Sequence, residues 1–161
     1  MKRVMAFLLV TIFFLTGCGK ADKGTDESKV EFYVNNVSLV PGEDFSKVKN
    51  DLGDPVDVME AASCYFEGND KIFTYDDYEV RTYPKDGTDV IQDICVKTDK
   101  FKTGKGITVG AGLSDITKAY GDNYKATGNM YKYYLDGDKY IYFFLLDDMV
   151  KFFGYAIDVA N

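Results

Sequence analysis

The chain has 161 residues, with 26 acidic and 19 basic side chains and no histidine. The negative balance argues against nucleic acid as a partner, because phosphate backbones are bound by surfaces rich in Lys and Arg. The absence of histidine removes the commonest general base and the commonest zinc ligand. We therefore expect no catalytic residue, no metal site and no cofactor.

The N-terminus has the pattern of an export signal. Lys2 and Arg3 precede an apolar run at 4–15, which is shorter than the roughly 20 residues of a membrane-spanning helix. The four residues at 15–18, Leu-Thr-Gly-Cys, resemble the lipobox of bacterial lipoproteins. This resemblance implies cleavage before Cys18 and a diacylglycerol anchor on its thiol. An uncleaved membrane anchor and a plain secretion signal are the alternatives.

The resemblance divides the start of the chain into two segments. Residues 1–17 are then a lipoprotein signal peptide, and residues 18–29 a lipidated tether. The tether contains no large apolar residue, so it cannot bury enough surface to fold and we expect it to be flexible. The protein is accordingly predicted at the cell membrane, on its extracytoplasmic side, where the lipid on Cys18 holds it.

Two aligned segments organise the rest of the chain. Residues 39–54 match residues 107–122 without gaps, including their glycines, one serine and their apolar positions. In each copy the apolar residues recur at spacings of three and four, which predicts a short amphipathic helix. The helices are expected to begin at serine N-caps and to end at glycines suited to a left-handed position, namely Ser46 and Ser114, and Gly53 and Gly121.

Runs of aromatic and β-branched residues, separated by turns rich in Asp and Gly, predict the strands. In chain order these lie within 32–40 and at 64–66, 72–75, 78–83, 90–96, 131–135, 140–146 and 150–157. The acidic turns lack the twelve-residue calcium-loop pattern, so we interpret them as turns rather than metal sites. The predicted fold class is α+β, with two tandem repeats, units 30–88 and 89–161, each a short helix packed on an antiparallel β-meander.

The segments 39–55 and 107–122 resemble the small-lipoprotein superfamily that includes the β-lactamase inhibitor protein and the SmpA/OmlA outer-membrane assembly lipoproteins. The shared features are an apolar residue followed by Gly and Ser, a short amphipathic helix, and Gly-Asp. The inhibitor protein is a tandem repeat whose sheets form a concave partner-binding surface. The resemblance therefore implies that fold and a sheet surface that binds a partner. This chain departs from the inhibitor in having no tryptophan and only three cysteines.

Two cysteines, Cys64 and Cys95, remain after lipidation of Cys18, in a compartment where disulfides persist. Both are predicted to lie in strands, and a bond between them would stabilise the fold by about 3–4 kcal/mol. The alternative is two unpaired thiols that pack as small apolar side chains. The sequence leaves both open.

The second unit has aromatic residues on both faces of its predicted strands. A half-exposed strand normally alternates apolar and polar side chains, which 140–145 and 150–157 do not. One short helix can cover only one face, so we predict that the other is partly exposed and binds a partner. The alternative places both faces in the interior. The candidate binding residues are Tyr131, Tyr133, Tyr140, Tyr142, Phe144, Phe153 and Tyr155.

These features predict an envelope-anchored lipoprotein that acts as a non-catalytic binding module for a protein or cell-wall partner. One alternative is a structural or assembly scaffold of an envelope complex. Another is an enzyme that uses carboxylates such as Asp122, Asp147 or Asp148. A pocket with convergent carboxylates would favour the enzyme, whereas an open aromatic sheet would favour the binding module.

Overall fold

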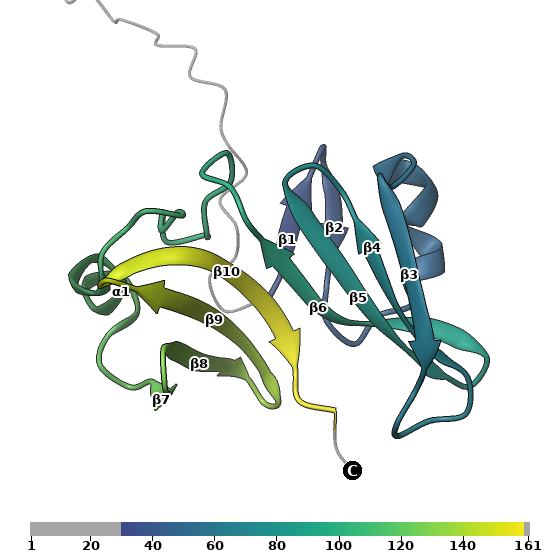
Figure 1. The fold of residues 1–161 in the computed structure, drawn as a ribbon. Helices are drawn as coiled ribbons and strands as arrows, with labels where there is room; N and C mark the ends of the chain where they lie inside the picture. Colours follow the sequence, from purple (N-terminus) through teal and green to yellow (C-terminus); the bar gives the residue numbers. More distant parts are fainter. Residues whose placement is uncertain (1–29, 160–161) are drawn as a thin grey trace, which may run out of the picture.

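The computed structural model describes residues 30–159, and nearly half of them form strands. Eight strands make one antiparallel sheet in the order β3-β4-β5-β6-β10-β9-β8-β7 (Figure 1). The strands are β3 (Asp57–Ala62), β4 (Asn69–Thr74), β5 (Tyr78–Lys85), β6 (Thr88–Val96), β7 (Lys125–Thr127), β8 (Met130–Asp136), β9 (Lys139–Leu146) and β10 (Met149–Ile157). The predicted signal peptide, the tether and the lipidation residue Cys18 lie outside the described residues.

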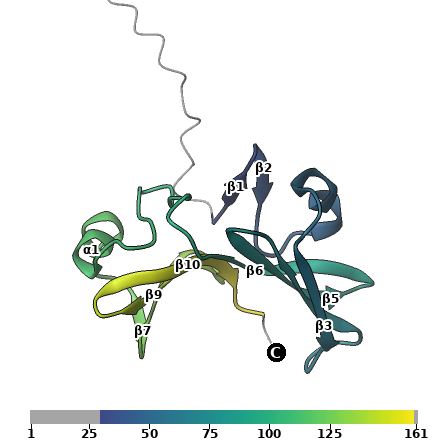
Figure 2. The same cartoon turned by 45° about the horizontal axis from the view of Figure 1, so that its top comes forward.

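The remaining elements lie on one side of this sheet (Figure 2). They are a hairpin of β1 (Phe32–Val34) and β2 (Val37–Leu39), two 3-10 segments, η1 (Phe45–Lys47) and η2 (Lys49–Leu52), and one α-helix, α1 (Leu113–Tyr120). We call the sheet surface beneath them the covered face and the opposite surface the open face. Both ends of the sheet bend away from the covering elements, so the open face is the inner side of an arch (Figure 2).

The main hydrophobic core lies between the covered face and the covering elements. Phe45 of η1 and Ile116 of α1 are at most 1% exposed and pack into it. One row of paired residues crosses the covered face from β4 to β8 and is at most 5% exposed at every position: Phe73, Val80, Ile94, Tyr155, Ile141 and Tyr133. Burial of each such side chain contributes about 1.5–3 kcal/mol to folding.

The prediction of an α+β fold, with two tandem repeats that each place a helix on a separate meander, is wrong. The described residues contain a single α-helix, and the first predicted helix is instead the pair η1 and η2. That segment carries a β-branched residue and the weak helix formers Ser, Asn and Asp. The two meanders are also not separate, because β6 pairs with β10 over four residues of each. The protein therefore has a mostly-β fold built on one continuous sheet.

Neither predicted serine caps a helical segment. Asp44 caps η1, since its Oδ1 accepts the amide hydrogen of Ser46 over 2.9 Å. The helix α1 begins after Gly112, whose amide donates to Oδ2 of Asp115 over 3.0 Å. A carboxylate accepts such bonds as well as a hydroxyl does, so Asp44 takes the cap position of η1, while Asp115 in the first turn of α1 binds the amide of the N-cap residue. The glycines that end the two segments have φ of 80° and 82°, a conformation that strains other residues: Gly53 and Gly121.

The two aligned segments attach to the sheet through matching backbone hydrogen bonds. Gly42 donates its amide hydrogen to the carbonyl of Ile91 in β6 over 2.7 Å, and Gly110 donates to that of Val150 in β10 over 2.9 Å. Ile91 and Val150 each donate an amide hydrogen back to the residue after the glycine, over 2.8 and 2.9 Å. The matched glycines therefore mark where each segment meets the centre of the sheet.

Both edge strands, β3 and β7, were absent from the sequence-based prediction, and a third predicted strand is wrong. All residues of β3 and β7 are exposed, so no buried face distinguishes them. The predicted strand at 64–66 belongs instead to the loop between β3 and β4, where Cys64 is exposed. Within residues 30–159, no helix has the length and apolar character needed to cross a membrane.

Candidate functional site

Two neighbouring rows of side chains cross the open face, because paired residues in an antiparallel sheet point to the same side. The first row, from β4 to β8, is Ile72, Arg81, Asp93, Ala156, Tyr140 and Tyr134. The second row is Thr74, Glu79, Cys95, Gly154, Tyr142 and Lys132. Both rows therefore pass from charged residues on β5, through small residues on β10, to tyrosines on β9.

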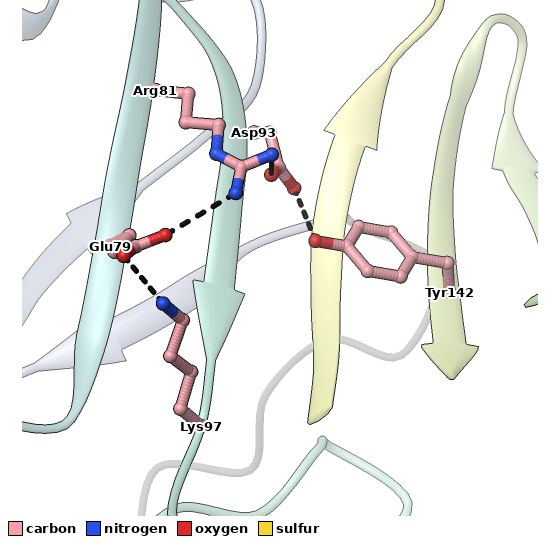
Figure 3. Close-up of polar contacts among 5 residues, drawn as sticks. All are labelled: Glu79, Arg81, Asp93, Lys97 and Tyr142. Carbon is pink, nitrogen blue, oxygen red and sulfur yellow. Dashed lines mark hydrogen bonds and ion pairs between the residues drawn. The ribbon is translucent and has the colours of Figure 1, made fainter. Parts of the chain in front are cut away.

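Five side chains, which we call the polar cluster, meet at the centre of this face: Glu79, Arg81, Asp93, Lys97 and Tyr142 (Figure 3). The hydroxyl of Tyr142 donates to Oδ1 of Asp93 over 2.8 Å, and Nη1 of Arg81 lies 3.8 Å from its Oδ2. Nη2 of Arg81 donates to Oε2 of Glu79 over 3.3 Å, and Lys97 donates to Oε1 over 2.5 Å. Each carboxylate thus has two partners that fix its position.

Asp93 is only 9% exposed, which is unusual for a carboxylate. Burial raises the pKa of its carboxyl to about 6. The hydrogen bond from Tyr142 and the positive charges of Arg81 and Lys132 oppose this rise, while the negative charge of Glu79 adds to it. Asp93 therefore exchanges its proton close to neutral pH, and the net charge of the polar cluster changes there.

The other buried titratable groups of the open face stay protonated at neutral pH. Burial raises the pKa of the Cys95 thiol to about 11 and that of the Tyr142 hydroxyl well above its ordinary value. A protonated thiol is a weak nucleophile, and a protonated phenol is a hydrogen-bond donor. The arrangement therefore suits recognition through hydrogen bonds and charge better than nucleophilic chemistry.

Gly154 makes room for Tyr142 at the centre of the face. A Cβ atom at this position would lie 2.5 Å from the hydroxyl oxygen of Tyr142 and 2.4 Å from the carbonyl oxygen of Ile94. The end of the tyrosine ring consequently lies directly over the glycine, which lets its hydroxyl reach Asp93 on the far side of β10. A side chain at 154 would prevent this contact.

A groove of about 540 Å³ lies along the open face beside the polar cluster. A second hollow of about 370 Å³ adjoins it towards the loop after β3 and shares Gln92, Tyr140 and Ile157 with it. The residues that line the groove mix three chemistries, namely charged, aromatic and small apolar side chains: Arg81, Asp93, Cys95, Lys97, Met130, Lys132, Tyr140, Tyr142, Phe152 and Ala156, with Gln92 and Ile157. The open face thus has two adjoining hollows lined by charged, aromatic and apolar side chains.

Three of the seven candidate binding residues lie on the open face, namely Tyr140, Tyr142 and Phe144. Phe144 stacks on Phe152 with ring centroids 4.7 Å apart and an interplanar angle of 3°. The ammonium of Lys132 lies 4.1 Å from the centre of the Tyr140 ring, a cation–π contact. Tyr140 and Tyr142 line the groove on its β9 side, whereas Phe144 does not line it.

The other four candidates point to the covered face, and the structure does not bring them to the same surface. Tyr133, Phe153 and Tyr155 are at most 5% exposed within the main core. Tyr131 is half-buried and pairs with Phe143, so it also points to the covered side. These four residues therefore do not belong to the open face, because alternation along a strand places them on its opposite side.

The residues of the polar cluster on β5 and β6 were not predicted from the sequence. A signal was available for Asp93, which is the one charged residue in the run Val-Ile-Gln-Asp-Ile-Cys-Val at 90–96. A buried strand tolerates such a carboxylate only where partners satisfy it. Its partners Arg81 and Tyr142 come from other strands, and nothing local connects them to Asp93.

Cys64 and Cys95 are both free thiols, one exposed in a loop and one buried on β6, so the structure has no disulfide between them. Asp147 and Asp148 have φ of 54° and 57° in the β9–β10 turn, and Asp122 is exposed after α1. Among residues 30–159 no cluster of three metal-ligating side chains is present.

Comparison with known proteins gives no family for this chain. No protein-family model matches it, and no curated protein matches its sequence. One solved structure that it resembles is an extracellular protein containing an SCP domain from Bacillus anthracis str. Ames, with 14% sequence identity and a TM-score of 0.48. That match covers 73% of this chain but only 44% of the other chain.

Proposed function

We propose that this chain is a lipid-anchored, non-catalytic binding protein of the cell envelope, and that the open face binds its protein or cell-wall partner. The observation that carries the proposal is the polar cluster. A buried carboxylate, Asp93, is held by Tyr142 and Arg81 on a sheet surface that no described element covers. Burying a charged group costs stability, so its retention on an open surface favours a role in recognition.

The composition of the open face fits a binding surface. Tyr and Arg are enriched at the centres of protein interfaces, where they combine large contact area with hydrogen-bonding capacity. Arg81 is 46% exposed on its side chain and remains accessible, although Glu79 and Asp93 restrain it. Side chains that are already held in place lose little entropy on binding, so a partner would meet a preorganised surface.

The anchoring half of the proposal rests on the N-terminal sequence. The lipobox-like residues at 15–18 assign the lipid to Cys18, and residues 19–29 supply a polar tether between it and the sheet. A diacylglycerol with a further acyl chain gives firm attachment, because each buried methylene contributes about 0.8 kcal/mol. The open face would then meet its partner close to the membrane surface.

Anchoring can be tested by cell fractionation of two cysteine variants. Cys18→Ala should leave the membrane fraction and appear in the soluble or culture fraction, whereas Cys64→Ala should remain in the membrane, because only the first removes the lipidated thiol. Metabolic labelling with a palmitate analogue should mark the wild-type chain and the Cys64→Ala variant only. Retention of Cys18→Ala in the membrane would refute the lipid anchor.

Binding can be tested with the chain from residue 19 onwards, which lacks the lipid-bearing cysteine and which we call the soluble domain, and with envelope material from the same cell. Immobilised wild-type domain should retain a protein or a purified cell-wall fragment, and Arg81→Ala with Phe152→Ala should lose most of it. Truncation of central interface anchors commonly costs about 2 kcal/mol or more, equivalent to about thirtyfold in affinity. Lys118→Ala, on the exposed side of α1, is the matched control. Equal capture by all three proteins would rule out the open face as the site.

A further inference from the structure

The two edges of the eight-stranded sheet differ in how they are protected against a further strand. β7 is only three residues long, and it includes a lysine, Lys125, whose ammonium lies 4.6 Å from the Tyr134 ring. β3 has six residues, all exposed, and pairs with β4 in an unbroken register without a bulge. Short length, lysine and bulges are the usual devices that block an edge. β7 uses the first two of them, whereas β3 uses none of these three and carries only two acidic side chains, Asp57 and Glu60.

The backbone of β3 is therefore available for pairing. In an antiparallel edge strand, alternate residues direct their N–H and C=O groups away from the neighbouring strand. No described strand pairs with the outer edge of β3, which is the outermost strand on its side of the sheet (Figure 1). Large apolar side chains also remain exposed along it, with Val58 at 42% and Met59 at 60%. An added strand would satisfy these backbone groups and bury these side chains.

Charge along β3 defines the kind of strand that fits. Asp57 and Glu60 are its charged residues, and neither makes an ion pair within the described part of the chain, although Glu60 accepts a hydrogen bond from Nδ2 of Asn69 over 3.3 Å and helps to raise the pKa of Lys71, its neighbour on β4. On the neighbouring strand β4, Lys71 is engaged by Asp89 at 2.9 Å. Asp57 lies on the open-face side with Met59, while Glu60 lies on the other side with Val58. Each side of β3 thus presents one carboxylate beside an apolar residue.

We propose that β3 is a strand-addition site, to which an extended peptide segment with basic and β-branched side chains binds as a new edge strand. Backbone hydrogen bonds supply the pairing, and two cations spaced three residues apart meet Asp57 and Glu60. Pairing with a second copy of this chain is disfavoured, because two β3 strands would bring four carboxylates to one interface. The site is the edge of the sheet and is distinct from the groove beside the polar cluster.

A capped seven-residue peptide, Thr-Lys-Val-Thr-Lys-Val-Thr, tests the proposal with the soluble domain. It should bind in a titration, and hydrogen exchange should slow at alternate amides of residues 57–62 and not at 125–127. The same peptide with Glu in place of Lys should bind about tenfold more weakly or not at all. A version with Pro at its centre keeps the charge but cannot continue a strand, so it should not bind.

Charge reversal on the protein provides the matched pair of variants. Asp57→Lys with Glu60→Lys should weaken binding of the lysine peptide about tenfold, whereas Asp122→Lys with Asp136→Lys, which changes net charge equally near β7, should not. Absence of binding at millimolar peptide, or equal binding of the proline peptide, would overturn the proposal. So would slowed hydrogen exchange at a strand other than β3. A dimer of the unmodified domain that Met59→Lys dissociates would also overturn it, since the occupant of the edge would then be a second copy.

Discussion

The two faces of the sheet are built from the same strands but differ in what they bury. On β9, Ile141 and Phe143 point to the covered face and are 0% exposed, whereas their neighbours Tyr140 and Tyr142 point to the open face and keep 9% and 7%. The covered face is apolar and packed beneath other elements. The open face retains a buried carboxylate, two accessible cations and a groove. The covered face therefore provides stability, and we assign recognition to the open face.

The largest loss of stability is expected from truncating a core side chain of the covered face. Phe143→Ala should lower the free energy of unfolding by about 4 kcal/mol, because it removes a fully buried ring from the main core. Phe152→Ala, on the open face, removes a ring that is only partly buried, so it should lower the free energy of unfolding by only roughly 1 kcal/mol. Denaturant unfolding of both variants measures the difference. Similar losses in the two would mean that the open face is part of the core.

The next effect concerns the pH dependence of stability. The pKa of Asp93 is about 6 in the folded protein against an ordinary value of 3.8, so the folded state holds the proton more tightly than the unfolded chain. Its contribution to stability is present below the unfolded pKa and is lost as pH rises through about 6. The loss amounts to about 3 kcal/mol.

Asp93→Asn should remove this loss, so its free energy of unfolding should fall less than that of the wild type between pH 4 and 7. Glu79→Gln is the control with the opposite sign. Burial raises the pKa of Glu79, but Lys97 and Arg81 lower it further, so its contribution is lost as pH falls. Denaturant titrations between pH 4 and 7 test the Asp93 prediction, and titrations continued below pH 4.5 test the Glu79 control, because the pKa of Glu79 is lowered from its ordinary 4.5. Parallel pH profiles for wild type and Asp93→Asn would contradict the account of Asp93.

A side chain added at Gly154, in the centre of the open face, should cause a smaller loss of stability. Gly154→Ala should lower the free energy of unfolding by about 2 kcal/mol, because its Cβ would overlap Tyr142 and the carbonyl of Ile94. The displaced tyrosine would lose its hydrogen bond to Asp93, so partner capture should fall as well. Tyr142→Phe in the same protein should relieve the contact with the hydroxyl only. Unchanged stability and capture in Gly154→Ala would show that this contact has no role.

The inner strands of the sheet could be predicted from the sequence, whereas its edge strands could not. The predicted strands at 90–96, 140–146 and 150–157 lie within β6, β9 and β10. Each contains a run of apolar residues, which is the sequence pattern of a buried strand. The edge strands β3 and β7 bury no face, so their residues look like those of loops. The same exposure that hid β3 from prediction makes its backbone available to a partner.

Pairing between distant strands explains the other errors. The joining of β6 to β10 through pairs such as Cys95 and Gly154 is a non-local contact that the local pattern does not encode. The polar cluster has the same origin, since Asp93 and Tyr142 are 49 residues apart. Two local features were predicted correctly, namely the glycines that end the helical segments, Gly53 and Gly121. Tyr133, Phe153 and Tyr155 were assigned to the surface because alternation alone does not show which face is covered.

The central claim, that the open face binds the partner, is tested most directly by site-specific photo-crosslinking in the cell that makes the protein. A benzophenone amino acid in place of Phe152 reports contacts of the groove, and the same amino acid in place of Lys118 reports contacts of the exposed side of α1. Our account predicts a discrete crosslinked product from position 152 that Arg81→Ala diminishes, and none from position 118. A product from position 118 alone, or no product from 152, would contradict it.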